Sequence, residues 1–161
     1  MFYLDIFAAL HRHQVDYVLI GGLAVALHGI ERNTMDIDVS VVVSPENMAH
    51  LVHAIQELGL QPMLPVPLST LQDIDTLKSW HTSRNLQAFA LRSDRLAGVT
   101  LDVLIFPPVD PLGMVERAHR LDIAGVPVAL ASIDDLIALK QSAGRPIDLA
   151  DIAHLKRLKP T

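Results

Sequence analysis

Cysteine is absent from the 161-residue chain. Without thiols the chain cannot form a disulfide framework or a thiolate zinc site, and it suits a reducing compartment. No uninterrupted apolar run approaches the roughly 20 residues that a membrane-spanning helix needs. The N-terminal residues also lack the basic leader and small-residue cleavage site of a secretory signal. We therefore expect a soluble, cytoplasmic protein with no membrane partner.

Positive charge is also scarce. Lysine and arginine number 13 against 18 aspartate and glutamate residues, which gives a formal net charge of -5. Proteins that coat DNA or RNA usually show the opposite balance, because neutralising phosphates supplies most non-specific affinity. The balance argues against DNA coating. It leaves a transient RNA substrate open, because several lysines and arginines gather toward the C-terminus.

Several ligand-binding motifs are missing as well. The chain contains neither the G-x-G-x-x-G fingerprint of dinucleotide-binding domains nor the G-x-x-x-x-G-K sequence of a P-loop. Its eight histidines show no H-E-x-x-H spacing, so a catalytic zinc site is not expected.

Half of the residues are hydrophobic, and helical and strand patterns alternate along the chain. This alternation predicts one α/β (α+β) domain over residues 1–161. The expected helices cover residues 2–14, 23–29, 45–58, 111–119, 132–143 and 147–158. The expected strands cover residues 17–20, 36–43, 86–92, 98–106 and 121–130, the last as a strand or a hairpin around Gly125. Residues 60–80 contain three prolines and little periodicity, which predicts a loop or irregular insertion.

The sharpest local motif is Asp36-Ile37-Asp38 at the start of a predicted strand. Side chains alternate along a strand, so both carboxylates project from the same face, with Cα atoms roughly 6.5 Å apart. Two such carboxylates can bind one hard cation, and Mg²⁺ suits them because it also binds substrate phosphates. The alternative is a solvated strand end with two surface acids.

Asp102 interrupts the otherwise apolar strand 98–106. A carboxylate buried without a partner costs several kcal/mol, so Asp102 needs a ligand or a partner. It could pair with an arginine or cap a helix. A third acid beside Asp36 and Asp38 would instead complete a site for two metal ions that clamp the attacking and leaving oxygens of a displacement.

Gly21-Gly22 stands between a predicted strand and a predicted helix, where backbone N–H groups favour an anion. Such a pair can equally serve only as a turn. Arg32 and Thr34 precede the D-x-D strand, and Arg32 could reach a substrate phosphate or remain a surface arginine.

Lys140 falls at a core position of the helix 132–143. Buried lysines are usually paired, so its ammonium either points into a cleft or reaches water past a packed stem. In the last helix, Asp148 and Asp151 border the apolar stripe. They could complement the helix dipole, or Asp148 could form a salt bridge with Lys140 or Arg145.

Together, Gly21-Gly22, the Asp36-Ile37-Asp38 strand and Asp102 within TLDV resemble the nucleotidyltransferase superfamily typified by DNA polymerase β. The string GGLAVALHGIERNTMDIDV is similar to the branch of AbiEii-like toxins and their uncharacterised relatives. That branch also carries a Lys-x4-Arg or Lys motif and a D-x-x-D motif near the C-terminus. Lys140 with Arg145, and Asp148 with Asp151, match these motifs.

The resemblance implies a mixed twisted sheet flanked by helices, with the two C-terminal helices (132–158) packed by the cleft. It implies an Mg²⁺-dependent enzyme, with two ions, that transfers a nucleoside monophosphate from an NTP to an acceptor and releases pyrophosphate. Asp36, Asp38 and Asp102 would hold the metal, and Asp102 would help to activate the acceptor hydroxyl. The NTP would be bound by a second set of residues, Gly21, Gly22, Arg32, Thr34, Lys140 and Arg145, with Asp148 and Asp151 in support.

The acceptor is left open between tRNA, a protein hydroxyl and a small molecule. A toxin with an antitoxin partner is one biological role that the resemblance suggests. The competing hypothesis is a non-catalytic protein on the same scaffold, either a partner-binding or an antitoxin-like module.

Overall fold

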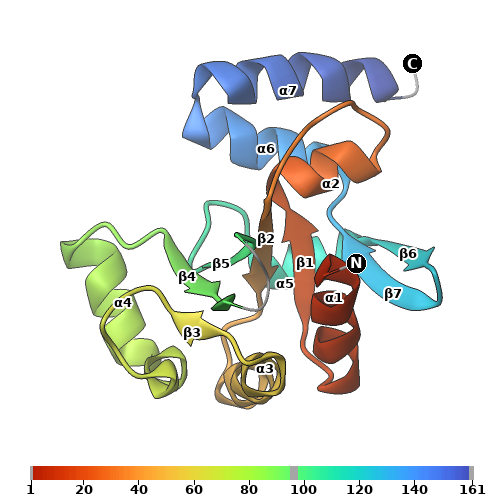
Figure 1. Cartoon of the computed structure of the whole chain (residues 1–161). Coiled ribbons are helices and arrows are strands. Elements are labelled where there is room, and N and C mark those ends of the chain that lie inside the picture. The colour runs from red at the N-terminus through yellow and green to blue at the C-terminus, as the bar shows by residue number, and fades with distance from the viewer. Residues whose placement is uncertain (1, 95–97, 160–161) are drawn as a thin grey trace.

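In the computed structural model, which describes residues 2–94 and 98–159, a mixed seven-stranded sheet forms the centre (Figure 1). Its strand order is β3-β4-β5-β2-β1-β7-β6. β2 pairs in parallel with β5, and β1 pairs in parallel with β7, whereas the remaining neighbours are antiparallel. The strands are β1 (Tyr17–Ile20), β2 (Asp36–Val41), β3 (Gln61–Pro62), β4 (Ala88–Arg92), β5 (Thr100–Leu104), β6 (His119–Ile123) and β7 (Val126–Leu130).

Helices flank the sheet, as expected for this fold class. α2, α6 and α7 lie together above one end of β1 and β2, whereas α1, α3 and α4 lie toward the other end (Figure 1). None of the helices in the described ranges is long and apolar enough to cross a membrane. The helices are α1 (Phe2–Arg12), α2 (Gly21–Leu27), α3 (Pro45–Leu58), the 3-10 helix η1 (Leu68–Gln72), α4 (Ile74–Ser83), α5 (Pro111–Arg117), α6 (Ile133–Ala143) and α7 (Pro146–Leu158).

The strand β2 separates the core from the site. Ile37, Val39 and Val41 are fully or almost fully buried, and they alternate with Asp36 and Asp38 on the other face. β5 shows the same alternation, since Leu101 and Val103 are buried while Asp102 lies on the half-open face. The apolar faces anchor both strands in the core, and the carboxylates share the opposite face.

Local signals explain why several elements begin and end as predicted. Ser44 caps α3 by accepting a hydrogen bond from the Asn47 backbone N–H, and Gly59 ends that helix in the left-handed conformation. β6 and β7 form the hairpin around Gly125. Ser132 caps α6, and Pro146 opens α7, so the helical pair predicted over residues 132–158 is confirmed.

The prediction of a loop or irregular insertion over residues 60–80 is wrong for much of that range. The three prolines precede a 3-10 helix, and α4 follows it. Asp73 caps α4 by accepting a hydrogen bond from the Thr76 backbone N–H, and Leu77 anchors the helix in the core. This helix is largely polar and Leu77 is its one fully buried side chain, so few apolar residues mark it in the sequence.

The same substitution at two serines should have opposite effects on stability. Ser40 is fully buried on β2 and its hydroxyl has no hydrogen-bond partner, whereas the Ser44 oxygen caps α3. We expect Ser40→Ala to raise the free energy of unfolding by about 1 kcal/mol, because it removes an unpaired buried hydroxyl. Ser44→Ala should lower it by about 1 kcal/mol through loss of the cap. Urea unfolding measures the free energy of unfolding of both variants. Changes of the same sign would contradict the different roles assigned to the two hydroxyls.

Candidate active site

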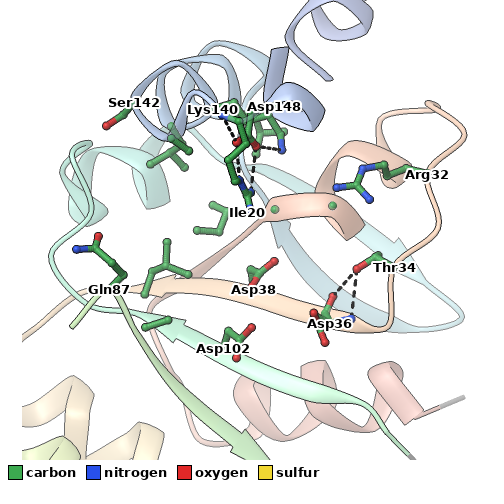
Figure 2. A pocket seen from close by; sticks show the side chains of 18 of the residues that line it. Ile20, Arg32, Thr34, Asp36, Asp38, Gln87, Asp102, Lys140, Ser142 and Asp148 are labelled. Carbon is green, nitrogen blue, oxygen red and sulfur yellow. Dashed lines mark hydrogen bonds and ion pairs between the residues drawn. The ribbon is translucent and has the colours of Figure 1, made fainter. Parts of the chain in front are cut away.

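The carboxylates of the site are brought together by strand register. In the parallel pairing of β2 with β5, Asp38 stands directly opposite Asp102, and Asp36 stands opposite Thr100. Figure 2 shows the three aspartates on these adjacent strands, with Asp38 between Gln87 on one side and Thr34 on the other. Two residues predicted from one motif and a third more than 60 positions later therefore share one face of the sheet.

Burial and repulsion between like charges make two of these carboxylates, Asp38 and Asp102, unusually basic. Burial, together with the negative charges of Asp102 and Asp36, raises the pKa of Asp38 to about 7. Burial and the charge of Asp36 also raise the pKa of Asp102. Within the described residues, no lysine or arginine forms an ion pair with any of the three. The cluster therefore holds negative charge that the protein itself leaves unneutralised.

Gly21 and Gly22 form the first turn of α2, which packs against β2. Gly21 adopts a φ of 74°, and a Cβ added there would overlap the Asp38 carboxylate. A Cβ at Gly22 would come within 3.3 Å of the Thr34 Cβ and 3.4 Å of the Arg32 guanidinium. The first glycine is therefore required by the carboxylate beneath it and not only by the turn.

Lys140 is buried, with only 7% of its side chain exposed, and its ammonium is paired with carboxylates of the protein. The Nζ lies 2.9 Å from Asp151 Oδ2 and 3.5 Å from Asp148 Oδ1. The two carboxylates belong to α7 and are almost completely buried. They hold the ammonium at the edge of the pocket that Lys140 lines (Figure 2).

The same two aspartates hold both arginines of the predicted site. Arg145 donates from Nε to Asp148 Oδ2 at 2.7 Å and from Nη2 to Asp148 Oδ1 at 3.1 Å. These hydrogen bonds hold the pKa of Asp148 below its usual value. Arg32 reaches Asp151 at 3.4 Å across 119 residues of sequence. The D-x-x-D motif therefore fixes three cationic side chains around one opening.

All of these groups except Asp151 border a single cavity of about 760 Å³. Its floor carries the three carboxylates, and its rim carries the three cations and the two glycines. Residues of α6 form the facing wall, which confirms that the C-terminal helices pack by the cleft. Of the predicted site residues, Gly21, Gly22, Arg32, Thr34, Asp36, Asp38, Asp102, Lys140, Arg145 and Asp148 line the cavity.

Sequence reasoning missed the remaining wall of the cavity. Gln87, Leu104, Pro108, Leu139 and Ser142 line it without belonging to any motif. The position of Leu104 follows from β5 once Asp102 is placed, because residues two apart share a face. The register of β4 against β5 sets Ala88 opposite Leu104. Nothing in the local sequence of either strand predicts this register.

The donor chemistry of the floor fits a divalent cation. Carboxylate oxygens are the ligands that Mg²⁺ prefers, and the raised pKa of Asp38 reflects charge that a cation would neutralise. Within residues 2–94 and 98–159, no group of three or more histidine or acidic side chains is arranged so that it could hold a metal ion by itself. Mg²⁺ does not require such a group, because it commonly binds through one or two carboxylates together with substrate phosphates and water.

Comparison with known protein families gives one match over nearly the whole chain. Residues 1–158 match the family described as "Nucleotidyltransferase of unknown function (DUF6036)". None of the curated proteins matches the chain.

Solved structures of nucleotidyltransferases share the fold. The antibiotic-resistance factor ANT(2'')-Ia in solution superposes with a TM-score of 0.58 at 18% identity, covering 98% of this chain and 80% of that one. Its crystal structure with adenylyl-2''-tobramycin gives 0.55 at 18% identity, covering 94% and 83%. An antigenic nucleotidyltransferase-like protein from Paracoccidioides brasiliensis gives 0.55 at 20% identity, covering 96% and 76%.

Alanine at the two glycines should separate their roles. Gly21→Ala places a side chain in a left-handed conformation and against Asp38, so we expect it to lower the free energy of unfolding by about 2 kcal/mol. Gly22→Ala is the matched comparison. Its Cβ would meet only the Thr34 and Arg32 side chains, at 3.3 and 3.4 Å, without a left-handed backbone, so we expect a smaller loss, of less than about 1 kcal/mol. Urea unfolding of both variants measures the difference. Equal losses would contradict the contact between Gly21 and Asp38.

The buried ion pairs of α7 make a second prediction. Asp151→Asn leaves the Lys140 ammonium buried beside a single, more distant carboxylate, so we expect a loss of about 3 kcal/mol in stability. The double variant Asp151→Asn/Lys140→Met should lose less than the sum of the two single variants, because the groups interact directly. Chemical unfolding of the four proteins gives this coupling. Strict additivity would mean that the two side chains do not interact.

Proposed function

The chain belongs to a family of nucleotidyltransferases, and from that premise we propose that it transfers a nucleoside monophosphate from an NTP to an acceptor hydroxyl with Mg²⁺. The observation that carries the proposal is the pairing of Asp38 with Asp102 on adjacent strands, beside Asp36 and beneath Gly21. This arrangement sets unneutralised carboxylates against a helix start and three cationic side chains within one cavity.

Asp36, Asp38 and Asp102 are the residues that would hold Mg²⁺, with two ions expected for this chemistry. When bound, the metal would neutralise charge on the phosphates and on the attacking and leaving oxygens. The charge balance of the site supports this role, because five carboxylates outweigh the three cations Arg32, Lys140 and Arg145. A polyphosphate would enter such a site unfavourably without added positive charge.

The triphosphate would lie between the start of α2 and the cations. Gly22 leaves room beside Thr34 and Arg32, and the backbone N–H groups of the first turn of α2 are available to phosphate oxygens. Lys140 and Arg145 would contact the phosphates while Asp148 and Asp151 hold them in place. Because these carboxylates are buried, the cations are already oriented before the nucleotide arrives.

Transfer would proceed by attack of an acceptor hydroxyl on the α-phosphorus. The new oxygen–phosphorus bond forms as the bond to the pyrophosphate oxygen breaks, and pyrophosphate leaves with the electron pair. Asp102 would take the hydroxyl proton. ANT(2'')-Ia, whose fold this chain shares, is described in complex with an adenylylated small molecule, which supports adenylyl transfer as one activity of this fold.

The biological setting of the reaction is a further part of the proposal. The resemblance to AbiEii-like toxins suggests a toxin with an antitoxin partner, acting in the cytoplasm. The acceptor could then be tRNA, a protein hydroxyl or a small molecule. Labelling a cell extract with each α-³²P-NTP distinguishes these, since the label follows the acceptor.

Isosteric removal of one carboxylate tests the catalytic role. Asp38→Asn should abolish transfer of label from an α-³²P-NTP, by at least about 1,000-fold, because it removes one of the three predicted metal ligands. Folding should be intact, because the same substitution relieves repulsion with Asp36 and Asp102. Activity and urea unfolding measured on the same preparation check both points. Retained transfer would contradict the assignment.

Thermal unfolding separates an enzyme from a non-catalytic module on this scaffold. Ligand at 100 times its Kd stabilises the folded state by about 2.7 kcal/mol, so NTP with Mg²⁺ should raise the Tm by several degrees. NTP with EDTA should raise it much less, because the carboxylates then repel the phosphates. A Tm that is unchanged with every NTP and Mg²⁺ would favour the partner-binding or antitoxin-like alternative.

A further inference from the structure

The cavity has two chemically different ends, separated along the direction of β2 and β5. At one end Gly22, Arg32 and Thr34 pack together, next to Asp36. At the other end, two residues beyond Asp102, Leu104 pairs with Ala88 on β4, and Gln87 precedes Ala88. Figure 2 shows Arg32 and Thr34 on one side of Asp38, with Gln87 and Ser142 on the opposite side.

The chemistry of transfer assigns a role to each end. In an in-line displacement the attacking oxygen and the departing pyrophosphate lie on opposite sides of the α-phosphorus. Pyrophosphate belongs at the end where the start of α2 and Arg32 supply N–H groups and positive charge. The oxygen that links the α-phosphorus to the nucleoside is equatorial to this axis, so the nucleoside extends to one side of it. The end beyond Asp102 is therefore left for the acceptor.

We propose that this end is the acceptor subsite, and that it binds a small, largely uncharged hydroxylated molecule instead of a nucleic acid. The inference rests on the proposed transfer activity and adds the class of acceptor. The residues that form the subsite are Gln87, Ala88, Leu104, Pro108, Leu139 and Ser142.

The residues that line the acceptor subsite indicate which class of acceptor molecule it binds. Its side chains are apolar except for the Gln87 amide and the Ser142 hydroxyl. Gln87 donates from Nε2 to Asn85 at 2.7 Å, which leaves its carbonyl oxygen to accept from a ligand hydroxyl. Apolar walls with a few polar groups are typical of small-molecule sites of about 300–1,000 Å³, and the whole cavity is about 760 Å³.

Nucleic acid would need a different lining. RNA and DNA are held chiefly through phosphate contacts with lysine and arginine. Among the described residues, the cations that line the cavity are Arg32, Lys140 and Arg145, and each is tied to Asp148 or Asp151 and not to the acceptor subsite. None of the six residues that form the acceptor subsite is a lysine or an arginine, so these residues supply no positive charge to a polynucleotide backbone.

Matched tryptophan substitutions on α6 test the proposal. Ser142→Trp places a large side chain in the acceptor subsite. Gln141→Trp adds the same side chain at the preceding position, which is exposed like Ser142 but does not line the cavity. Each protein is incubated with α-³²P-NTPs, Mg²⁺ and one of three fractions of a cell extract, namely molecules below 1 kDa, RNA or protein. Binding of a non-hydrolysable α,β-methylene NTP with Mg²⁺ is measured in parallel by calorimetry.

We expect label in the fraction below 1 kDa. Ser142→Trp should reduce this transfer roughly 100-fold, while the Kd of the nucleotide analogue changes less than about twofold and Gln141→Trp behaves as the parent protein. Label in RNA or protein, with the Mg²⁺–NTP complex bound, would overturn the acceptor class and leave the proposed function standing. Equal loss of nucleotide binding and transfer in Ser142→Trp would place the nucleotide in this end and overturn the subsite. No label in any fraction would contradict the transferase activity itself and remove the basis of the inference.

Discussion

The parallel pairing of β2 with β5 sets Asp38 directly beside Asp102, and the arrangement of the whole site depends on this contact between like charges. Acidic side chains opposite each other on a sheet are destabilising, and here burial increases the cost. The apolar residues on the reverse face of both strands hold the pairing in place. The missing side chain of Gly21 leaves the space that the Asp38 carboxylate occupies beneath α2. The fold therefore maintains a concentration of negative charge that a divalent cation could relieve.

The positive charge of the site is kept separate from this cluster. Lys140, Arg32 and Arg145 pair with Asp148 and Asp151 on α7, and not with the carboxylates of the sheet. If the cations paired with Asp38 or Asp102 instead, they would compete with a metal for the same oxygens. Two buried aspartates thus serve to orient three phosphate-binding candidates while the sheet carboxylates stay available. This division of charge gives a physical reason for the D-x-x-D motif near the C-terminus.

Features that depend on neighbouring residues in the chain could be predicted from the sequence, and those that depend on distant pairing could not. The strand Tyr17–Ile20, the helix Pro45–Leu58 and the shared face of Asp36 and Asp38 follow from local pattern, caps and strand alternation. The pairing of Asp38 with Asp102, and the salt bridge from Arg32 to Asp151 across 119 residues, require the tertiary fold. Lys140 was ambiguous because a core position on a helix does not identify its partner. The helix α4 was missed because it is largely polar and follows three prolines, so its apolar positions do not stand out in the sequence.

We propose that Asp36, Asp38 and Asp102 hold the metal at which the nucleotide binds. The most direct measurement is anomalous X-ray diffraction from crystals grown with Mn²⁺ and a non-hydrolysable α,β-methylene NTP. We expect Mn²⁺ peaks bounded by these three carboxylates and by the nucleotide phosphates, with the β- and γ-phosphates toward Gly22 and Arg32. Mn²⁺ bound elsewhere, or nucleotide bound without Mn²⁺ at these aspartates, would contradict this proposal.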